Sequence, residues 1–306
     1  MLFLRLPRQA LLACIILSLF IVRCDAPESS REITSARSGA PAADSRRVLV
    51  LLSSAKALEL RDGTRYPTGF FLNELTVPVH ALMAAGYAPV LATPSGRPAV
   101  MDPASDHPRF FQDANEYTER RAMLDELLPG TRSLKDILAE GLDDYAALFV
   151  PGGHAPMQDL ARDERVGQIL RAFHASARPT ALICHGPAAL LSAGANPAGV
   201  VAALEAGDAA AARKAAGDWI YAGYRMTAFS EAEEDVVEGS DRLSARLRWD
   251  VEPALRALGA KVIVNRENFQ SRVVRDRELI TGQNPASDGA FTRALLASLR
   301  ERAAKR

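Results

Sequence analysis

The sequence has little cysteine and no excess of charge, and each shortage excludes something. It holds three cysteines in 306 residues, and Cys14 and Cys24 lie near the N-terminus, so Cys184 is the single cysteine of the rest. A lone cysteine excludes an intrachain disulfide there and leaves the chemistry of its thiol to be explained. Lysine and arginine (37) equal aspartate and glutamate (37) in number; residues 1–45 hold five arginines and four acidic residues, so 32 basic and 33 acidic residues remain. Such a balance supplies no basic surface for non-specific binding, and we predict no nucleic-acid partner.

Apolar residues are plentiful but are not arranged as a series of membrane spans. The composition is 48% hydrophobic and 24% charged, as in ordinary globular proteins, which excludes disordered, collagen-like and multi-span membrane chains. One apolar run, residues 9–22, follows Arg5 and Arg8 and ends at Arg23. A positive flank, a short apolar core and a polar exit are typical of a secretory signal. We therefore predict that residues 1–24 are a signal peptide or an N-terminal anchor.

The processing of this leader stays open at the level of sequence. No small-x-small cleavage pattern stands near Cys24, and Arg23 occupies the position where lipidation of Cys24 needs a small residue. A retained anchor would associate with the membrane, although the run is short for a core of about 30 Å. A start codon assigned upstream of a cytosolic protein is the remaining alternative. Residues 25–45, rich in Ala, Ser, Pro and charge, are predicted to be a flexible linker, and the leader predicts a periplasmic or otherwise extracytoplasmic location.

From residue 46 onward, β-rich runs alternate with helical patterns, and no internal repeat is visible. The predicted strands are 48–52, 88–93, 145–150 and 180–183, with late strands at 261–264, 273–274 and 279–280. The predicted helices are 73–85, 116–128, 166–177 and 288–303, with a further helical excursion in the Ala-rich segment 198–216. Alternation of this kind predicts βαβ units in an α/β fold with a mostly parallel sheet covered on both faces. We expect residues 46–306 to form one domain.

The sequence Cys184-His185-Gly186-Pro187 directly follows a predicted buried strand. Open α/β sheets carry their sites at the carboxyl ends of strands, so this position suits a functional thiol. Gly186 permits a tight turn, and Pro187 suits the first position of a helix. The pattern predicts a nucleophile elbow, and the helix N-terminus together with His185 favours the thiolate form of Cys184. An inert buried cysteine is the alternative interpretation.

His185 is suited to acid or base catalysis beside the thiol, and such a base needs a carboxylate to orient it. Residues 231–235 read Glu-Ala-Glu-Glu-Asp and begin a predicted helix. An acidic first turn also occurs simply because it suits the helix dipole. Charge alone therefore does not choose among these four carboxylates.

Residues 181–189, ALICHGPAA, resemble the cysteine elbow of the ThiJ/PfpI superfamily, a flavodoxin-like group related to class I glutamine amidotransferases. Further blocks resemble its heat-shock chaperone and glyoxalase III branch: residues 68–74 (TGFFLNE), 149–154 (FVPGGH), 227–230 (TAFS) with the acidic run, and 279–287 (LITGQNPAS). The blocks span about residues 46–300 in the order that the family has. The resemblance implies a flavodoxin-like three-layer α/β/α sandwich.

Carried over to this chain, the resemblance implies that Cys184 is the nucleophile and His185 the adjacent acid or base. It implies Glu234 as the orienting carboxylate, with Glu233 as its nearest competitor. Glu74 would face the thiol from the first helix. A carboxylate beside a thiolate must be protonated or repel it, so we expect Glu74 to be a neutral hydrogen-bond donor with a raised pKa.

The resemblance also implies an oxyanion or substrate-binding role for Gly152, Gly153 and His154. The N–H groups of Gly153 and His185 are the expected oxyanion donors. Ala155 departs from the family, which commonly has Gly after the glycine-glycine-histidine turn, and this leaves the path of the loop uncertain.

The glyoxalase III branch implies a cofactor-free lyase that converts methylglyoxal or related 2-oxoaldehydes into 2-hydroxy acids through a hemithioacetal on Cys184. Neither glutathione nor a metal ion is expected to be needed, and His80, His107 and His174 show no metal-ligand spacing. A homodimer is the default assembly. Three alternatives stay open: a holdase-type chaperone, a cysteine peptidase or amidase, and a glutaminase domain, for which this chain has no synthetase partner domain.

Overall fold

The structure is a computed structural model that describes residues 46–240 and 243–305. The predicted leader (1–24) and linker (25–45) lie outside these residues, so the predicted domain division stays a prediction. Within the described ranges, no helix combines the length and the apolar character that a membrane span requires.

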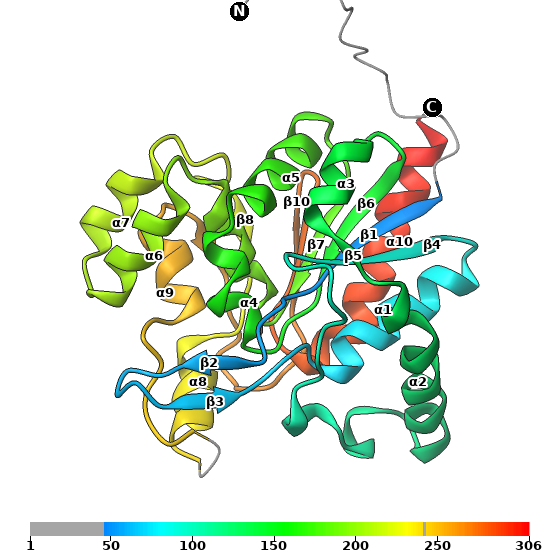
Figure 1. Cartoon of the computed structure of the whole chain (residues 1–306), viewed down its shortest axis with the longest axis horizontal. Coiled ribbons are helices and arrows are strands. Elements are labelled where there is room, and N and C mark those ends of the chain that lie inside the picture. The colour runs from blue at the N-terminus through cyan, green and yellow to red at the C-terminus, as the bar shows by residue number, and fades with distance from the viewer. Residues whose placement is uncertain (1–45, 241–242, 306) are drawn as a thin grey trace, which may run out of the picture. The chain divides into compact units, whose positions relative to one another are not determined.

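A seven-stranded sheet forms the centre of the molecule (Figure 1). Its strands, in spatial order, are β10 (Val273–Asp276), β11 (Leu279–Gly282), β7 (Thr180–Ile183), β6 (Tyr145–Val150), β1 (Arg47–Leu51), β4 (Ala88–Thr93) and β5 (Arg132–Ser133). Every neighbouring pair is parallel except β10 and β11. All four residues of β7 are buried, as expected of a parallel strand covered on both faces.

Helices cover both faces of this sheet (Figure 1). On one face pack α1 (Leu72–Ala84), α2 (Ala114–Leu127) and α10 (Asp288–Ala304), and on the other α3 (Leu134–Glu140), α5 (Glu164–Ala175) and the 3-10 helix η5 (Gly186–Ala193). The predicted three-layer α/β/α sandwich with a mostly parallel sheet is confirmed. The strands and long helices also lie within a few residues of their predicted positions.

The remaining elements surround the carboxyl ends and one side of the sheet. They are the antiparallel hairpin β2 (Ala57–Glu59) and β3 (Arg65–Pro67), the parallel pair β8 (Arg225–Met226) and β9 (Lys261–Val262), and the helices α4 (Ala155–Gln158), α6 (Pro197–Glu205), α7 (Ala209–Ala216), α8 (Glu231–Glu238) and α9 (Val251–Ala257). Further 3-10 turns are η1 (Pro103–Ser105), η2 (Pro108–Phe110), η3 (Leu128–Gly130), η4 (Leu160–Arg162) and η6 (Pro285–Ser287). The Ala-rich segment forms two helices because Asp208 caps the second, accepting a 2.9 Å bond from the Ala211 amide.

The strand order reverses direction between β1 and β6. After β1, the chain forms β4 and β5 on one side of this strand. It then returns and forms β6, β7 and β11 on the other side. The carboxyl ends of strands beside such a switch point form the crevice in which α/β proteins bind ligands. The loop after β6 and the residue after β7 both lie at that edge, which positions the candidate site.

Candidate active site

Cys184 stands at a sharp turn that the surrounding backbone enforces. Its φ angle is +62°, which an L-residue rarely adopts and which costs of order 1–3 kcal/mol. The turn is held on both sides, because Cys184 N–H donates to the Gly282 carbonyl and Phe229 N–H donates to the Cys184 carbonyl, each at 2.9 Å. The predicted elbow is therefore present. It leads into a 3-10 helix, and Gly186 is needed for close packing, since a Cβ there would lie 2.6 Å from the Val150 carbonyl oxygen.

The two glycines after β6 let the backbone press against the thiol. A Cβ on Gly152 would lie 2.6 Å from both the Cβ of Cys184 and Oε2 of Glu74. Gly153 has a φ of +81°, and a Cβ on it would overlap the Gly69 carbonyl at 2.0 Å. The Gly152 N–H donates to Glu74 Oε2 at 3.0 Å, so it is not free for an oxyanion. The Gly153 N–H bonds the sulfur of Cys184, where it lowers the thiol pKa.

Glu74 faces the thiol from the first turn of α1, as expected. Its side chain is fully buried, and burial raises its pKa to about 8, so the carboxyl group is protonated at neutral pH. Its hydrogen bond to Cys184 has the opposite, smaller effect on that pKa. The raised pKa and the neutral form of Glu74 are those that the sequence predicts, whereas donation of a hydrogen bond to the sulfur stays a prediction.

The ionisation of Cys184 differs from the sequence prediction. Burial raises the pKa of the thiol well above its usual range. His185 Nδ1 lies 3.2 Å from the sulfur, and burial, reinforced by His154, lowers the pKa of the imidazole. This direction contradicts the expectation of a resting thiolate, and desolvation is its largest cause. The resting pair is a neutral thiol beside a neutral imidazole that can accept its proton.

Glu234, on α8, orients His185 and is itself held by a second histidine. Its Oε2 lies 2.7 Å from His185 Nε2, and its Oε1 lies 2.9 Å from His154 Nε2. Burial opposes ionisation of Glu234, but the two histidines hold its pKa well below its usual range. The rings of His154 and His185 are 4.0 Å apart, and Phe229 stacks on His185 at 4.5 Å. Sequence reasoning missed the bond from His154 to Glu234, which joins residues 80 positions apart.

Glu233, the competitor for this role, is used elsewhere. It forms a capping box with Ser230, and its Oε1 accepts bonds from the Phe269 amide at 2.7 Å and from Asn284 Nδ2 at 2.6 Å. The geometry therefore places Glu234, and not Glu233, against His185. The sequence held a signal for this, since Ser230-Glu231-Ala232-Glu233 has the spacing of a capping box.

One group of side chains in the described ranges has the spacing for a metal ion. The ligand atoms of His154, His185 and Glu234 lie within 4.8 Å of one another, and all three residues are buried. Both Nε2 atoms already bond the carboxylate oxygens of Glu234. A metal ion would compete with these hydrogen bonds.

The other histidines lie apart from this group. His80 and His107 are exposed, and His174 bonds Glu278 at 2.7 Å and Tyr224 at 3.2 Å. Ala155 is accommodated as the first residue of α4, with His154 as the residue before the helix. The loop path is therefore compatible with the alanine.

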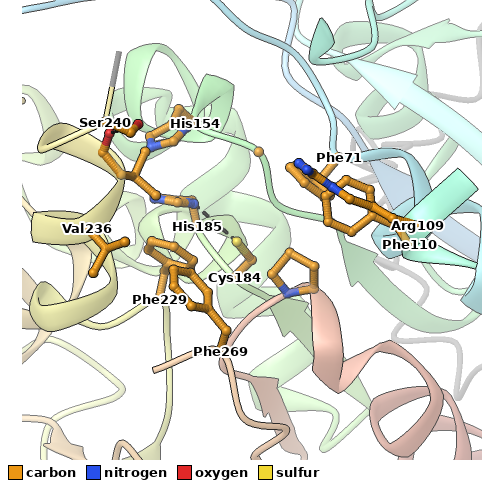
Figure 2. Close-up of a pocket in the computed structure, with 13 residues that line it drawn as sticks. Phe71, Arg109, Phe110, His154, Cys184, His185, Phe229, Val236, Ser240 and Phe269 are labelled. Carbon is orange, nitrogen blue, oxygen red and sulfur yellow. Dashed lines mark hydrogen bonds between the residues drawn. The ribbon is translucent and has the colours of Figure 1, made fainter. Parts of the chain in front are cut away.

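A cavity of about 380 Å³ opens above the thiol (Figure 2). Cys184, His185, His154 and Gly153 are among its lining residues, so the structure brings most of the predicted site residues to one cavity. The rest of its wall is mainly apolar and comprises Phe71, Phe110, Phe229, Phe269, Val236, Val237 and Pro285, with Arg109 and Ser240 as the polar exceptions. Sequence reasoning did not identify this aromatic wall.

Comparison with known proteins agrees with this geometry. Residues 66–298 match the DJ-1/PfpI family. The chain belongs to the DJ-1/PfpI family. Among similar proteins, the protein/nucleic acid deglycase HchA of Staphylococcus aureus strain MSSA476 is 30% identical over 250 residues, covering 78% of this chain and 75% of the deglycase. The proteins of that name from strains MW2 and JH9 match with the same identity and coverage.

Solved structures of similar fold support the architecture of this DJ-1/PfpI member. Glyoxalase III from Candida albicans has a TM-score of 0.63 at 21% identity, covering 82% of this chain and 96% of that one. Rapid Encystment Protein 24 kDa from Francisella tularensis has a TM-score of 0.63 at 24% identity, covering 83% and 99%. At these identities the likeness concerns the fold.

Proposed function

We propose that this protein is a glutathione-independent glyoxalase that converts methylglyoxal or related 2-oxoaldehydes into 2-hydroxy acids. One observation carries the proposal. The Cys184 thiol lines a cavity beside a neutral histidine that can accept its proton, and the fully buried, protonated Glu74 adjoins the same thiol. A nucleophile flanked by a base and an acid suits addition to a carbonyl followed by proton transfer. The 30%-identical relatives named deglycase support this class of chemistry.

The first step forms the carbon–sulfur bond. Sγ of Cys184 adds to the aldehyde carbon while the thiol proton passes to His185 Nδ1, 3.2 Å away. Glu234 stabilises the resulting imidazolium through its 2.7 Å bond to Nε2. The aldehyde oxygen takes a proton from Glu74, which gives a neutral hemithioacetal and leaves Glu74 as a carboxylate. The thiol of the enzyme thereby takes the place of glutathione.

The second stage moves a proton from C1 to C2. The Glu74 carboxylate removes the C1 proton, the electron pair forms an enediolate, and the ketone oxygen receives the proton held on His185. Glu74 then returns its proton to C2 and takes up the proton of the C1 hydroxyl, which leaves a thioester of the 2-hydroxy acid on Cys184 and restores the protonated Glu74. Water, deprotonated by His185, attacks the thioester, and the released sulfur recovers a proton. The sum is one 2-oxoaldehyde and one water converted into one 2-hydroxy acid.

A glutathione-free assay tests this proposal. Purified protein is given methylglyoxal, and lactate is measured by a coupled dehydrogenase. We expect lactate from the wild type and none above background from Cys184→Ala, because the described chain has no second thiol to form the adduct. Cys184→Ala is conservative in volume and should retain the wild-type melting temperature. Equal lactate production by the two proteins would refute the proposal.

A second candidate is removal of carbonyl adducts from amines, which the name of the 30%-identical relatives favours. Such adducts release free 2-oxoaldehyde spontaneously, so a glyoxalase also makes them disappear. The two activities separate by rate. A deglycase removes the adduct faster than its spontaneous release, whereas a glyoxalase cannot exceed that rate however much enzyme is added.

The holdase function and the peptidase or amidase function stay predictions, and the Cys184→Ala variant tests both. A holdase should keep its suppression of aggregation in Cys184→Ala, because its apolar surface is unchanged. A peptidase or amidase should instead cleave peptide or amide substrates and lose that activity in the variant.

We also propose an extracytoplasmic location and a homodimer. Fractionation of cells and light scattering on the purified protein test these two statements, and quantitative recovery in the cytosol would refute the first.

A further inference from the structure

We infer that the site acts on 2-oxoaldehydes with an aromatic substituent in preference to methylglyoxal. This inference rests on the proposed function and names its substrate class. It follows from the size of the cavity, from the geometry of its aromatic walls and from the exposed apolar side chains at its mouth.

The cavity is larger than methylglyoxal needs. Its volume of about 380 Å³ falls in the range of about 300–1,000 Å³ that is typical of pockets for drug-sized ligands. The substituent of methylglyoxal is a single methyl group, which would leave most of the apolar wall without contacts. Because dispersion contacts and removal of apolar surface from water both favour filling such a space, a bulkier apolar substituent should bind better.

The walls form two aromatic pairs on either side of the thiol (Figure 2). Phe71 and Phe110 meet edge to face with ring centroids 4.9 Å apart, and Phe229 and Phe269 lie 6.2 Å apart. Arg109, which also lines the cavity, stacks on the Phe110 ring at 4.7 Å. Aromatic rings prefer offset or edge-to-face partners at such separations. A flat ring between the two pairs can make contacts of both kinds.

The mouth of the cavity exposes apolar surface that a substituent would cover. Among the described residues, the exposed large hydrophobic side chains are Val236 (50% exposed), Phe269 (43%) and Met83 (43%). The first two line this cavity, whereas Met83 lies on α1 and does not. An adjoining hollow of about 280 Å³ shares Phe110 and Phe269 with it and leaves room for substituents on the ring. Exposed apolar side chains gathered at a cavity indicate a ligand surface.

The reaction places the ring where these walls are. Sulfur adds to the aldehyde carbon, and the ring is carried by the adjacent ketone carbon, which projects from the adduct into the cavity. With phenylglyoxal the atoms balance as before: one phenylglyoxal and one water give one mandelate. No further reactant is needed, because the proton leaves C1 and returns to C2.

The test compares phenylglyoxal with methylglyoxal on the purified full chain without glutathione. We expect kcat/KM for phenylglyoxal to exceed that for methylglyoxal by at least about tenfold, the scale of discrimination that apolar pockets achieve. Mandelate and lactate must be quantified directly, since phenylglyoxal also modifies arginine. Turnover with a ratio of one or below would overturn this inference alone. Absence of turnover with both substrates would overturn the proposed function as well.

Variants locate the preference on the aromatic wall. Phe269→Ala and Phe110→Ala should each lower the phenylglyoxal-to-methylglyoxal ratio of kcat/KM by roughly tenfold. Met83→Ala, which removes an equally exposed apolar side chain outside the cavity, should leave the ratio and both rates unchanged. Melting temperatures confirm that each variant is folded. A ratio that is the same in both phenylalanine variants and the wild type would contradict the assignment.

Discussion

Replacement of Glu74 by glutamine should stabilise the protein while it abolishes most of the turnover. Glu74 is fully buried, and its carboxyl is protonated at neutral pH because burial raises its pKa from 4.5 to about 8. Glutamine has the shape and the hydrogen-bonding groups of this protonated acid. Its carbonyl oxygen can accept the Gly152 N–H that now donates to Oε2 at 3.0 Å, and its amide can donate to the sulfur.

The size of this stabilisation and its dependence on pH follow from the difference between the Glu74 pKa in the folded and in the unfolded chain. The folded protein keeps the Glu74 proton up to about pH 8, whereas the unfolded chain releases it near 4.5, so stability is lost as the pH rises between these values. At 1.36 kcal/mol for each pH unit, the wild type loses about 3 kcal/mol by pH 7 and about 5 kcal/mol by pH 9. Glutamine carries no such penalty. The advantage of Glu74→Gln over the wild type should therefore grow from about 1 kcal/mol at pH 5 to about 5 kcal/mol at pH 9.

Urea denaturation of both proteins at pH 5, 7 and 9 measures this advantage. Glu126→Gln, the same substitution at an exposed position of α2, is the control and should change stability by less than about 0.5 kcal/mol at every pH. The kcat of Glu74→Gln should fall by at least about a hundredfold, because glutamine cannot carry a proton from C1 to C2. A stability difference that does not change with pH would refute the reasoning about Glu74. A kcat near the wild-type value would refute its role in proton transfer.

Three further predictions concern the groups around the thiol. Glu234→Gln should lower kcat by roughly a hundredfold, since the imidazolium of His185 loses its counter-charge. Glu233→Gln should chiefly lower the melting temperature. Equal losses of kcat in the two variants would contradict this division of roles. His154→Gln should lower kcat less and move the acidic limb of the pH profile to higher pH, because His154 lowers the pKa of His185; an unmoved limb would show that His154 has only a packing role. In the wild type, kcat/KM should rise with pH through a His185 pKa below 6.5 and fall near pH 8 as Glu74 loses its proton, whereas a profile flat to pH 10 would contradict this.

The fold could be predicted from sequence where a pattern repeats along an element. A parallel sheet is indicated by the continuous apolar runs of β1, β6 and β7 and by the periodic helices between them. The position of Cys184 at the end of β7 follows from this pattern. The hairpin of β2 and β3 was not predicted, because each strand has only three residues and β2 packs against α4, which is distant in the sequence. A strand of three residues is too short to show a periodic pattern of its own.

The site could be predicted only where its residues lie together in the chain. Cys184 and His185 are adjacent, so the elbow follows from the local sequence. The bond between His154 and Glu234 joins distant residues and depends on how α8 docks over the sheet. The thiolate prediction failed for a related reason, since the desolvation that keeps Cys184 protonated is a property of the assembled cavity.

Detection of the covalent intermediate tests the central claim most directly. The wild type is mixed with methylglyoxal, quenched in acid at millisecond to second intervals, digested and analysed by mass spectrometry. The account predicts a methylglyoxal-derived adduct on the peptide that contains Cys184, which forms and decays at rates compatible with kcat. Adducts confined to lysine and arginine peptides, in a protein that nevertheless produces lactate, would contradict it.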